Sequence, residues 1–167
     1  MEVVAAAWWL RRHAPQMRVR VVNVVDLMTL FRPDVHPHGM DEGTFVQLFT
    51  RDRDVVFAFH GYQRAIHESI HGRPHAERFH VRGFNEEGTT TTPFDMVVRN
   101  GMSRYHLCIE ALRRAAAARA EPLEGARSWP TDALIDQCKA ALARHETYVR
   151  EHFEDMPEVA AWKWTDA

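Results

Sequence analysis

The order of apolar patterns along this chain predicts an α/β fold with a mostly parallel, doubly wound sheet. Residues 19–25 and 54–60 are short runs of β-branched and aromatic side chains, and residues 78–84 alternate between apolar and polar types. Both patterns are typical of β-strands. Segments with a helical spacing of apolar residues follow each predicted strand. Strands that alternate with helices favour a parallel sheet covered by helices on both faces.

Helical periodicity and end signals define the remaining elements. Val4, Ala7, Trp8 and Arg11 recur at spacings of three and four within the first helix. Gly72 and Pro74 end a later helix. The final helix is long and buries one stripe of side chains. The predicted helices and helical turns span residues 2–13, 26–31, 41–50, 62–71, 93–101, 104–119 and 131–153.

The stretch from Arg82 to Met96 predicts a strand, a polar loop and the start of a helix. Four consecutive threonines at 89–92 have poor helix propensity, because each loses rotamer freedom against the preceding turn. Thr92 is the predicted N-cap, Pro93 suits the first helical position, and Asp95 falls at the third, where an acid stabilises the helix start. Such units build ligand-facing edges in α/β proteins.

Size and composition fit one globular domain. The 167 residues are 46% hydrophobic and 26% charged, and 21 basic against 23 acidic residues give a formal net charge of −2. Because charges are mixed along the sequence, they predict no binding to nucleic acid or to an anionic membrane. No apolar run approaches the roughly 20 residues of a membrane span. Cys108 and Cys138 are expected to be free, buried thiols in a reduced cytoplasm.

We expect one domain made of two consecutive parts. Residues 1–120 form its α/β core, and residues 121–167 supply a linker, the C-terminal helix and a tail. The C-terminal helix is predicted to bury a stripe that includes Cys138, Ala141 and His145. No internal repeat divides the chain further.

Several long stretches resemble the C-terminal domain of phosphoketolases. They are RVRVVNVVDLMTLF at 18–31, PDVHPHGM at 33–40, DVVFAFHGYQRAIHESIHGR at 54–73, GFNEEGTTTTPFDMVVRN at 83–100, SRYHLCIEAL at 103–112 and HETYVREHFEDMPEVAAWKW at 145–164. The likeness runs from about Met1 to the end of the chain. The resemblance implies a cytoplasmic enzyme of carbohydrate metabolism that cleaves xylulose 5-phosphate or fructose 6-phosphate with inorganic phosphate, giving acetyl phosphate and an aldose phosphate.

The resemblance also implies a sheet that lacks its first strand. The transketolase-like C-terminal domain of this family opens with a strand and a helix before the strand that corresponds to residues 19–25. This sequence begins directly in the helix. Residues 19–25 would then expose an unpaired sheet edge, which favours association with another chain. We therefore expect either a reading frame that starts further upstream or a gene remnant.

The cofactor of the family is thiamine diphosphate with magnesium, bound through a Gly-Asp-Gly stretch, a later asparagine and a separate glutamate. This sequence contains no Gly-Asp-Gly. In the family the cofactor lies between the two domains that precede this one. The resemblance therefore implies no cofactor and no catalytic residue in this chain, which would support a homodimer or the N-terminal thiamine-binding domains and be inactive alone. A stand-alone module that binds a small ligand or an organic phosphate is the alternative.

His67, Glu68 and His71 match H-E-x-x-H on a predicted helix, the arrangement of zinc peptidases. Gly72 and Pro74 end that helix at once, and no third ligand follows at a suitable spacing. A zinc hydrolase is therefore a minor alternative. The segment also belongs to the phosphoketolase match, in which these histidines are not zinc ligands.

Three further histidines lie near the predicted carboxyl edge of the sheet. His36 and His38 are separated by one residue in a loop, where they can ligate a metal, meet a phosphate, bond to the backbone or touch another domain. His60 follows a predicted buried strand, a position at which α/β folds bind ligands. We treat all three as possible interface or ligand-edge residues.

The polar loop before residue 93 is the strongest polar cluster. Its two carboxylates can act as a general acid and a general base when their environments differ. Its hydroxyls can hold an anion at a helix start. Two adjacent glutamates repel an anion, however, so an interdomain or subunit contact, or a rigid cap, fits better than a phosphate cradle. The residues concerned are Glu86, Glu87, Thr89, Thr90, Thr91 and Thr92.

Overall fold

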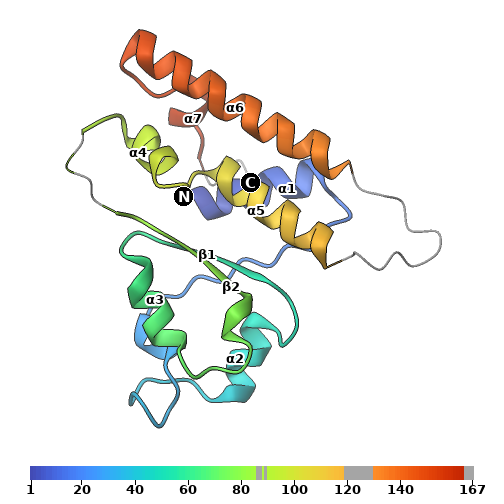
Figure 1. Ribbon diagram of the computed structural model, residues 1–167, viewed down its shortest axis with the longest axis vertical. Coiled ribbons are helices and arrows are strands. Elements are labelled where there is room, and N and C mark those ends of the chain that lie inside the picture. The colour runs from blue at the N-terminus through green and yellow to red at the C-terminus, as the bar shows by residue number, and fades with distance from the viewer. Residues whose placement is uncertain (86–87, 89, 119–129, 164–167) are drawn as a thin grey trace. The chain divides into compact units, whose positions relative to one another are not determined.

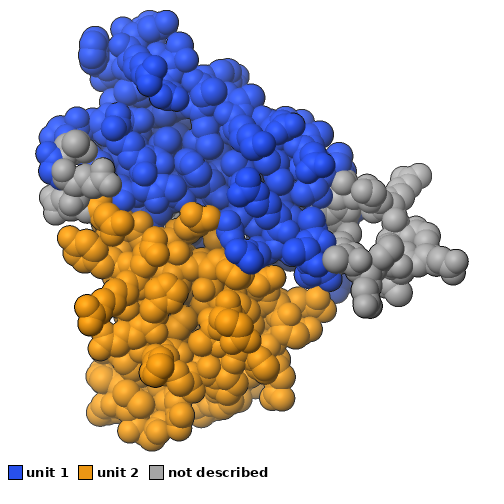
Figure 2. All heavy atoms as spheres, in the orientation of Figure 1, with its two compact units in different colours: residues 1–21, 86–167 blue, residues 22–85 orange. Residues whose placement is uncertain are grey.

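Two units with separate cores make up the chain (Figure 2). Unit 1 contains residues Met1–Val21 and Glu86–Ala167, and unit 2 contains residues Val22–Asn85. The computed structural model describes residues 1–85, 88, 90–118 and 130–163. Most of the predicted linker at 121–130 lies outside these described residues.

Unit 2 is built on a parallel pair of strands (Figure 1). Strand β1 (Val55–Phe59) pairs with β2 (Phe79–Gly83), with Val55 opposite Phe79 and Phe59 opposite Gly83. Helix α3 (Gln63–Ile70) and the short 3-10 helix η2 (Ala76–Arg78) connect the two strands. The crossover through a helix is what a parallel pair requires. The α/β class predicted from the sequence is therefore confirmed.

The core of unit 2 lies beneath one face of this sheet. The 3-10 helix η1 (Leu27–Leu30) and helix α2 (Glu42–Phe49) complete the unit, and each begins at an aspartate whose side chain accepts a backbone hydrogen bond. These caps satisfy amides that have no partner within the helix. The buried core residues are Leu30, Phe45, Phe49, Ile66, Ile70, Phe79 and Val81.

The predicted strand at residues 19–25 is wrong, because the sheet of the described residues has two strands and this segment is not one of them. Val22 and Val24 pack against the unit 2 core, whereas Val25 is 88% exposed. The alternation of valines indicates an extended conformation correctly. A strand also needs a neighbouring backbone with which to pair, and the local sequence carries no information about that neighbour.

Unit 1 is helical. It contains α1 (Glu2–His13), α4 (Pro93–Arg99), α5 (Arg104–Ala117), α6 (Thr131–His152) and α7 (Pro157–Ala160). Helix α5 packs against both α1 and α6, and α4 packs against α6 (Figure 1). No helix among the described residues has both the length and the apolar composition needed to cross a bilayer.

The helix ends of unit 1 follow their local sequence signals. Helix α1 has the predicted bounds, and α4 begins with Thr92 as N-cap and Pro93 at the first position, as predicted. Helix α6 ends at His152, and Phe153 after it adopts a left-handed conformation with φ of 58°. The cysteines are both buried and free, as predicted, and Cys108 Sγ lies 3.5 Å from the carbonyl oxygen of Ala6.

Candidate functional site

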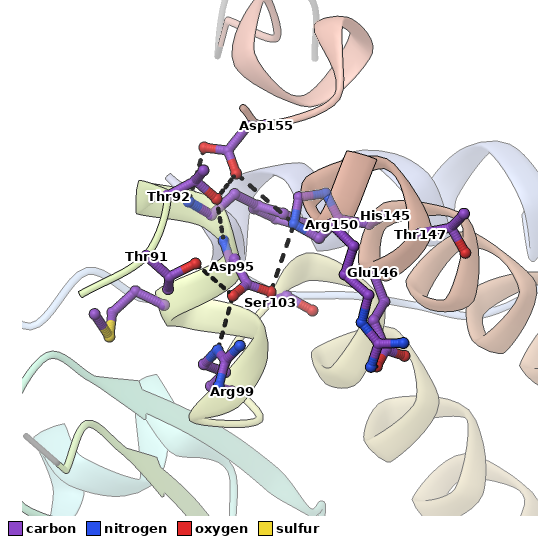
Figure 3. Close-up of polar contacts among 12 residues, drawn as sticks. Thr91, Thr92, Asp95, Arg99, Ser103, His145, Glu146, Thr147, Arg150 and Asp155 are labelled. Carbon is purple, nitrogen blue, oxygen red and sulfur yellow. Dashed lines mark hydrogen bonds and ion pairs between the residues drawn. The ribbon is translucent and has the colours of Figure 1, made fainter. Parts of the chain in front are cut away.

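Thr91 and Thr92 of the polar loop join a largely buried polar cluster at the start of α4 (Figure 3). Asp95 is 5% exposed, and its Oδ2 accepts hydrogen bonds from Thr91 Oγ1 at 2.7 Å and from Arg99 Nε at 2.8 Å. Burial raises the pKa of Asp95, but hydrogen bonds from Arg99 and Thr91 outweigh it, so the pKa lies below its ordinary value. Asp95 is therefore held as a carboxylate.

Asp155 brings the segment after α6 to the same helix start. Its Oδ1 accepts a hydrogen bond from Thr92 Oγ1 at 2.5 Å, and its Oδ2 accepts one from the backbone N–H of Phe94 at 2.9 Å. The side chain of Thr92 in turn accepts from the N–H of Asp95 at 3.4 Å. A carboxylate at a helix N-terminus satisfies free amides and complements the helix dipole. The C-terminal segment is thus tied to α4.

His145 lies between the two aspartates and is fully buried. Its Nε2 is 3.7 Å from Asp155 Oδ1 and 4.0 Å from Asp95 Oδ1, and its ring stands edge-on to Phe94 with centroids 4.8 Å apart. Neither ring nitrogen has a hydrogen-bond partner within the described part of the chain. The Nε2 atom of His145 thus faces carboxylate oxygens of both aspartates.

A groove of about 560 Å³ opens beside this cluster. Arg99 pairs with Asp95, Lys139 lies 3.0 Å from Asp136, and Arg150 lies 2.5 Å from Glu146. The groove therefore has cationic walls whose charges already have acidic partners. Its lining comes from α4, α5 and α6 and consists of Asp95, Val98, Arg99, His106, Lys139, Leu142, Ala143, Glu146 and Arg150.

The structure brings the predicted loop histidines together with an aspartate in unit 2. His38 Nδ1 lies 3.0 Å from Asp26 Oδ2, and the backbone N–H of His38 donates to His36 Nδ1 at 3.1 Å. The two rings are nearly perpendicular, with centroids 5.3 Å apart. A backbone hydrogen bond from Met28 is the main cause that lowers the pKa of Asp26, and His38 lowers it further. The carboxylate of Asp26 thus orients the ring of His38.

His60 lies at the carboxyl end of β1, where the sequence predicts it. Its ring stacks on Phe84, which follows β2, with centroids 4.5 Å apart. Thr90 is exposed, whereas Thr91 and Thr92 donate their hydroxyl hydrogens to the aspartates described above. Glu86, Glu87 and Thr89 lie outside the described residues.

The H-E-x-x-H motif does not form the geometry that its zinc chemistry requires. Helix α3 ends at Ile70, and His71 leaves it with φ of −57° and ψ of 131°. Two histidines share a metal only when both lie on one helical face. No group of three or more His, Cys, Asp or Glu residues able to hold a metal ion occurs in the described part of the chain. The predicted helix end at residue 71 is therefore one residue too long, because Gly72 stops the helix early.

Sequence reasoning did not identify His145 and Asp155 as members of a polar cluster. It placed His145 on the buried stripe of α6, and a histidine at such a position is itself a signal of a polar partner. Along the chain, His145 is about 50 residues from Asp95 and about 10 residues from Asp155. Helical spacing alone cannot identify contacts over such separations.

Comparison with known proteins matches nearly the whole chain. A family model described as "XFP C-terminal domain" matches residues 1–164. A "Probable phosphoketolase" of Pseudomonas putida is 50% identical over 169 residues, which cover 100% of this chain and 20% of the relative. Proteins with the same name in Brucella abortus and Bradyrhizobium diazoefficiens are each 49% identical, over 99% and 98% of this chain.

The chain spans about one fifth of the length of these relatives, with 20% of the Brucella protein and 19% of the Bradyrhizobium protein covered. The family model assigns that fifth to the C-terminal domain. The resemblance seen in the sequence is therefore confirmed.

Proposed function

Because this chain belongs to the XFP C-terminal domain family and corresponds to the C-terminal portion of a phosphoketolase, we propose that it supports the assembly of that enzyme. The whole-chain match to one fifth of the relatives is the observation that carries this proposal. The chain contributes to contacts between domains or subunits of a cytoplasmic homodimer. The reaction centre lies in the other four fifths.

The proposed parent reaction converts a ketose phosphate and inorganic phosphate into acetyl phosphate and an aldose phosphate. Thiamine diphosphate with magnesium supplies the carbanion chemistry in that enzyme. The described residues do not fit such a cofactor, because they contain no cluster of three metal-ligating side chains and the sequence has no Gly-Asp-Gly. We assign no step of the reaction to this chain.

The cluster at the start of α4 supports a structural role for the threonine loop. Thr91 and Thr92 direct their hydroxyls to Asp95 and Asp155, and His145 is closed off from solvent. Side chains that hydrogen-bond to one another in this way make a core more rigid. The loop then holds α4 and the C-terminal segment in place for neighbouring parts of the enzyme.

The two-stranded sheet of unit 2 also has features expected of a fragment of a larger sheet. We propose that residues 19–25 become a strand of a larger, transketolase-like, doubly wound sheet in a full-length phosphoketolase. Val22 and Val24 already pack on the core, whereas Val25 is 88% exposed and the segment belongs to no sheet among the described residues. Unpaired edges of this kind favour strand pairing.

The test is a Pseudomonas putida phosphoketolase whose matching C-terminal fifth is replaced by this chain. Acetyl phosphate formation from fructose 6-phosphate and phosphate is measured with thiamine diphosphate and magnesium. We expect turnover within about tenfold of the unaltered enzyme, a loss below roughly 1.4 kcal/mol in transition-state stabilisation. A folded hybrid without turnover would contradict the proposal.

The groove favours a second candidate, a module that binds an organic phosphate. Arg99, Lys139 and Arg150 supply cations along its walls, although each already has an acidic partner. A ligand present at 100 times its dissociation constant adds about 2.7 kcal/mol to stability. Thermal unfolding of the isolated chain with fructose 6-phosphate or inorganic phosphate measures this gain. A gain that Lys139→Ala abolishes would support the module, and an unchanged melting temperature would exclude it for these ligands.

A further inference from the structure

Residues 26–40, which we call the histidine loop, form a loop of unit 2 whose two ends lie close together. The backbone N–H of Met40 donates to the carbonyl of Thr29 at 3.1 Å, and the ring of His38 reaches back to Asp26 at 3.0 Å. Asp26 also caps η1 by accepting from the N–H of Met28 at 2.9 Å. Surface loops whose ends are joined in this way are frequently functional.

A buried arginine holds the histidine loop from beneath. The side chain of Arg73 is 1% exposed, and it donates to the carbonyl oxygens of Leu30 at 3.0 Å, Phe31 at 2.5 Å and Met40 at 2.8 Å. Glu42 lies 3.4 Å away and balances its charge. The fixed fork of a guanidinium orders the carbonyls that it binds. The loop is therefore pre-organised before any partner arrives.

The hydrogen bonds assign complementary tautomers to the two histidines. His36 Nδ1 accepts from a backbone N–H, so a neutral His36 carries its proton on Nε2. A neutral His38 that donates from Nδ1 to the Asp26 carboxylate has Nε2 as its acceptor. The side chain of His38 is 66% exposed. One donor and one acceptor thus lie on neighbouring rings. They are complementary to the C=O and N–H groups of a peptide backbone.

Apolar side chains next to and within the same loop are exposed. Val25 is 88% exposed, Val35 60% and Met28 38%. Apolar side chains combined with a few fixed polar groups are typical of a protein interface rather than of a small-anion site. Four fifths of a phosphoketolase polypeptide lies outside this chain, as the 20% coverage of the relatives shows.

We propose that the histidine loop is a docking surface for the preceding part of a phosphoketolase polypeptide, and that Arg73 positions it. This inference rests on the proposed function and adds the location of the contact. Docking buries the valines and pairs the rings of His36 and His38 with backbone groups of the partner segment. The loop need not rearrange, because Arg73 already fixes its backbone.

Histidine labelling with diethyl pyrocarbonate, read by mass spectrometry, tests the proposal. Labelling rates are measured in the isolated chain and in the Pseudomonas putida hybrid described above. His67, exposed on α3, and the buried His145 calibrate the fast and slow limits in the isolated chain. We expect the rate at His38 to fall at least tenfold in the hybrid. An equal rate at His38 in both proteins would overturn the docking surface.

His38→Ala, with His67→Ala as matched control, gives an independent readout. Both residues are exposed, so neither change should shift the melting temperature of the isolated chain by more than about 1 °C. In the hybrid, we expect His38→Ala to speed proteolytic release of the C-terminal fifth about fivefold or more, and His67→Ala to leave it unchanged. Equal release rates in the two variants would contradict the proposal.

The two proposals fail in different ways. An active hybrid in which His38 labels freely retains the proposed function and refutes only the docking surface. A folded hybrid without turnover refutes the proposed function and the docking surface together.

Discussion

Arg104 binds both carboxylate oxygens of Glu2, with Nε 3.0 Å from Oε2 and Nη2 2.8 Å from Oε1. The backbone N–H of Arg104 adds a third hydrogen bond to Oε2 at 2.8 Å. The guanidinium also lies over the rings of Phe94 and Trp162, 5.2 and 5.1 Å from their centroids. One side chain thus joins the first helix, α4 and the C-terminal segment of unit 1.

Glu2→Gln is expected to destabilise the isolated chain by about 3 kcal/mol. The side chains of Arg104 and Glu2 are 10% and 18% exposed, and removing one partner of a buried pair leaves the other charge uncompensated. Urea unfolding followed by circular dichroism measures the loss. Glu146→Gln is the control, because its pair with Arg150 is exposed and contributes less than about 0.5 kcal/mol. Equal effects of the two substitutions would refute the special role of Glu2.

Thr92→Ala is expected to lower the free energy of unfolding by about 1–2 kcal/mol, because it removes the N-cap of α4 and the donor to Asp155. Asp155→Asn should have a comparable effect. Since the residues touch, the double variant should lose less than the sum of the two losses. Thr147→Ala is a suitable control, because Thr147 is exposed and its hydroxyl donates to the Ala143 carbonyl within α6. Full additivity would show that the two residues act separately.

Stability should fall with acid through the titration of Asp95. The pKa of Asp95 is lowered from 3.8 in the folded state, so its contribution is complete above that value and is lost as pH falls through the lower, folded pKa. Asp95→Asn should flatten this part of the stability curve. Chemical unfolding from pH 6 down to about pH 2 measures both proteins. An unchanged slope in the variant would show that other carboxylates set the acid limit.

Residues 19–25 should become protected when the sheet is completed. We expect their backbone amides to exchange with deuterium at least about tenfold more slowly in the hybrid than in the isolated chain, because sheet pairing protects backbone N–H groups. The amides of β2 are paired with β1 in the isolated chain and serve as the reference. Unchanged exchange at 19–25 would contradict the proposed larger sheet.

Local signals predicted most elements, and the reasons are visible in single residues. Asp41 caps α2, and Thr92 caps α4 as the sequence predicts. Each of these effects acts within four residues, so the sequence around each position contains the information that is needed.

The failures involve contacts between distant residues. The valines of 19–25 indicate extended chain, but whether a neighbour pairs with them is not a local property. The contact between Thr92 and Asp155 joins residues 63 positions apart. Arg73 likewise reaches back 43 positions to Leu30. The polar clusters that organise both units could therefore not be predicted from periodicity or motif spacing.

The central claim is that this chain is a supporting part of a phosphoketolase whose reaction centre lies elsewhere. Its most direct test is acetyl phosphate formation by the isolated, folded chain supplied with fructose 6-phosphate, phosphate, thiamine diphosphate and magnesium. We predict no acetyl phosphate above the level of a reaction without protein. Sustained production that scales with the concentration of the isolated chain would contradict the account.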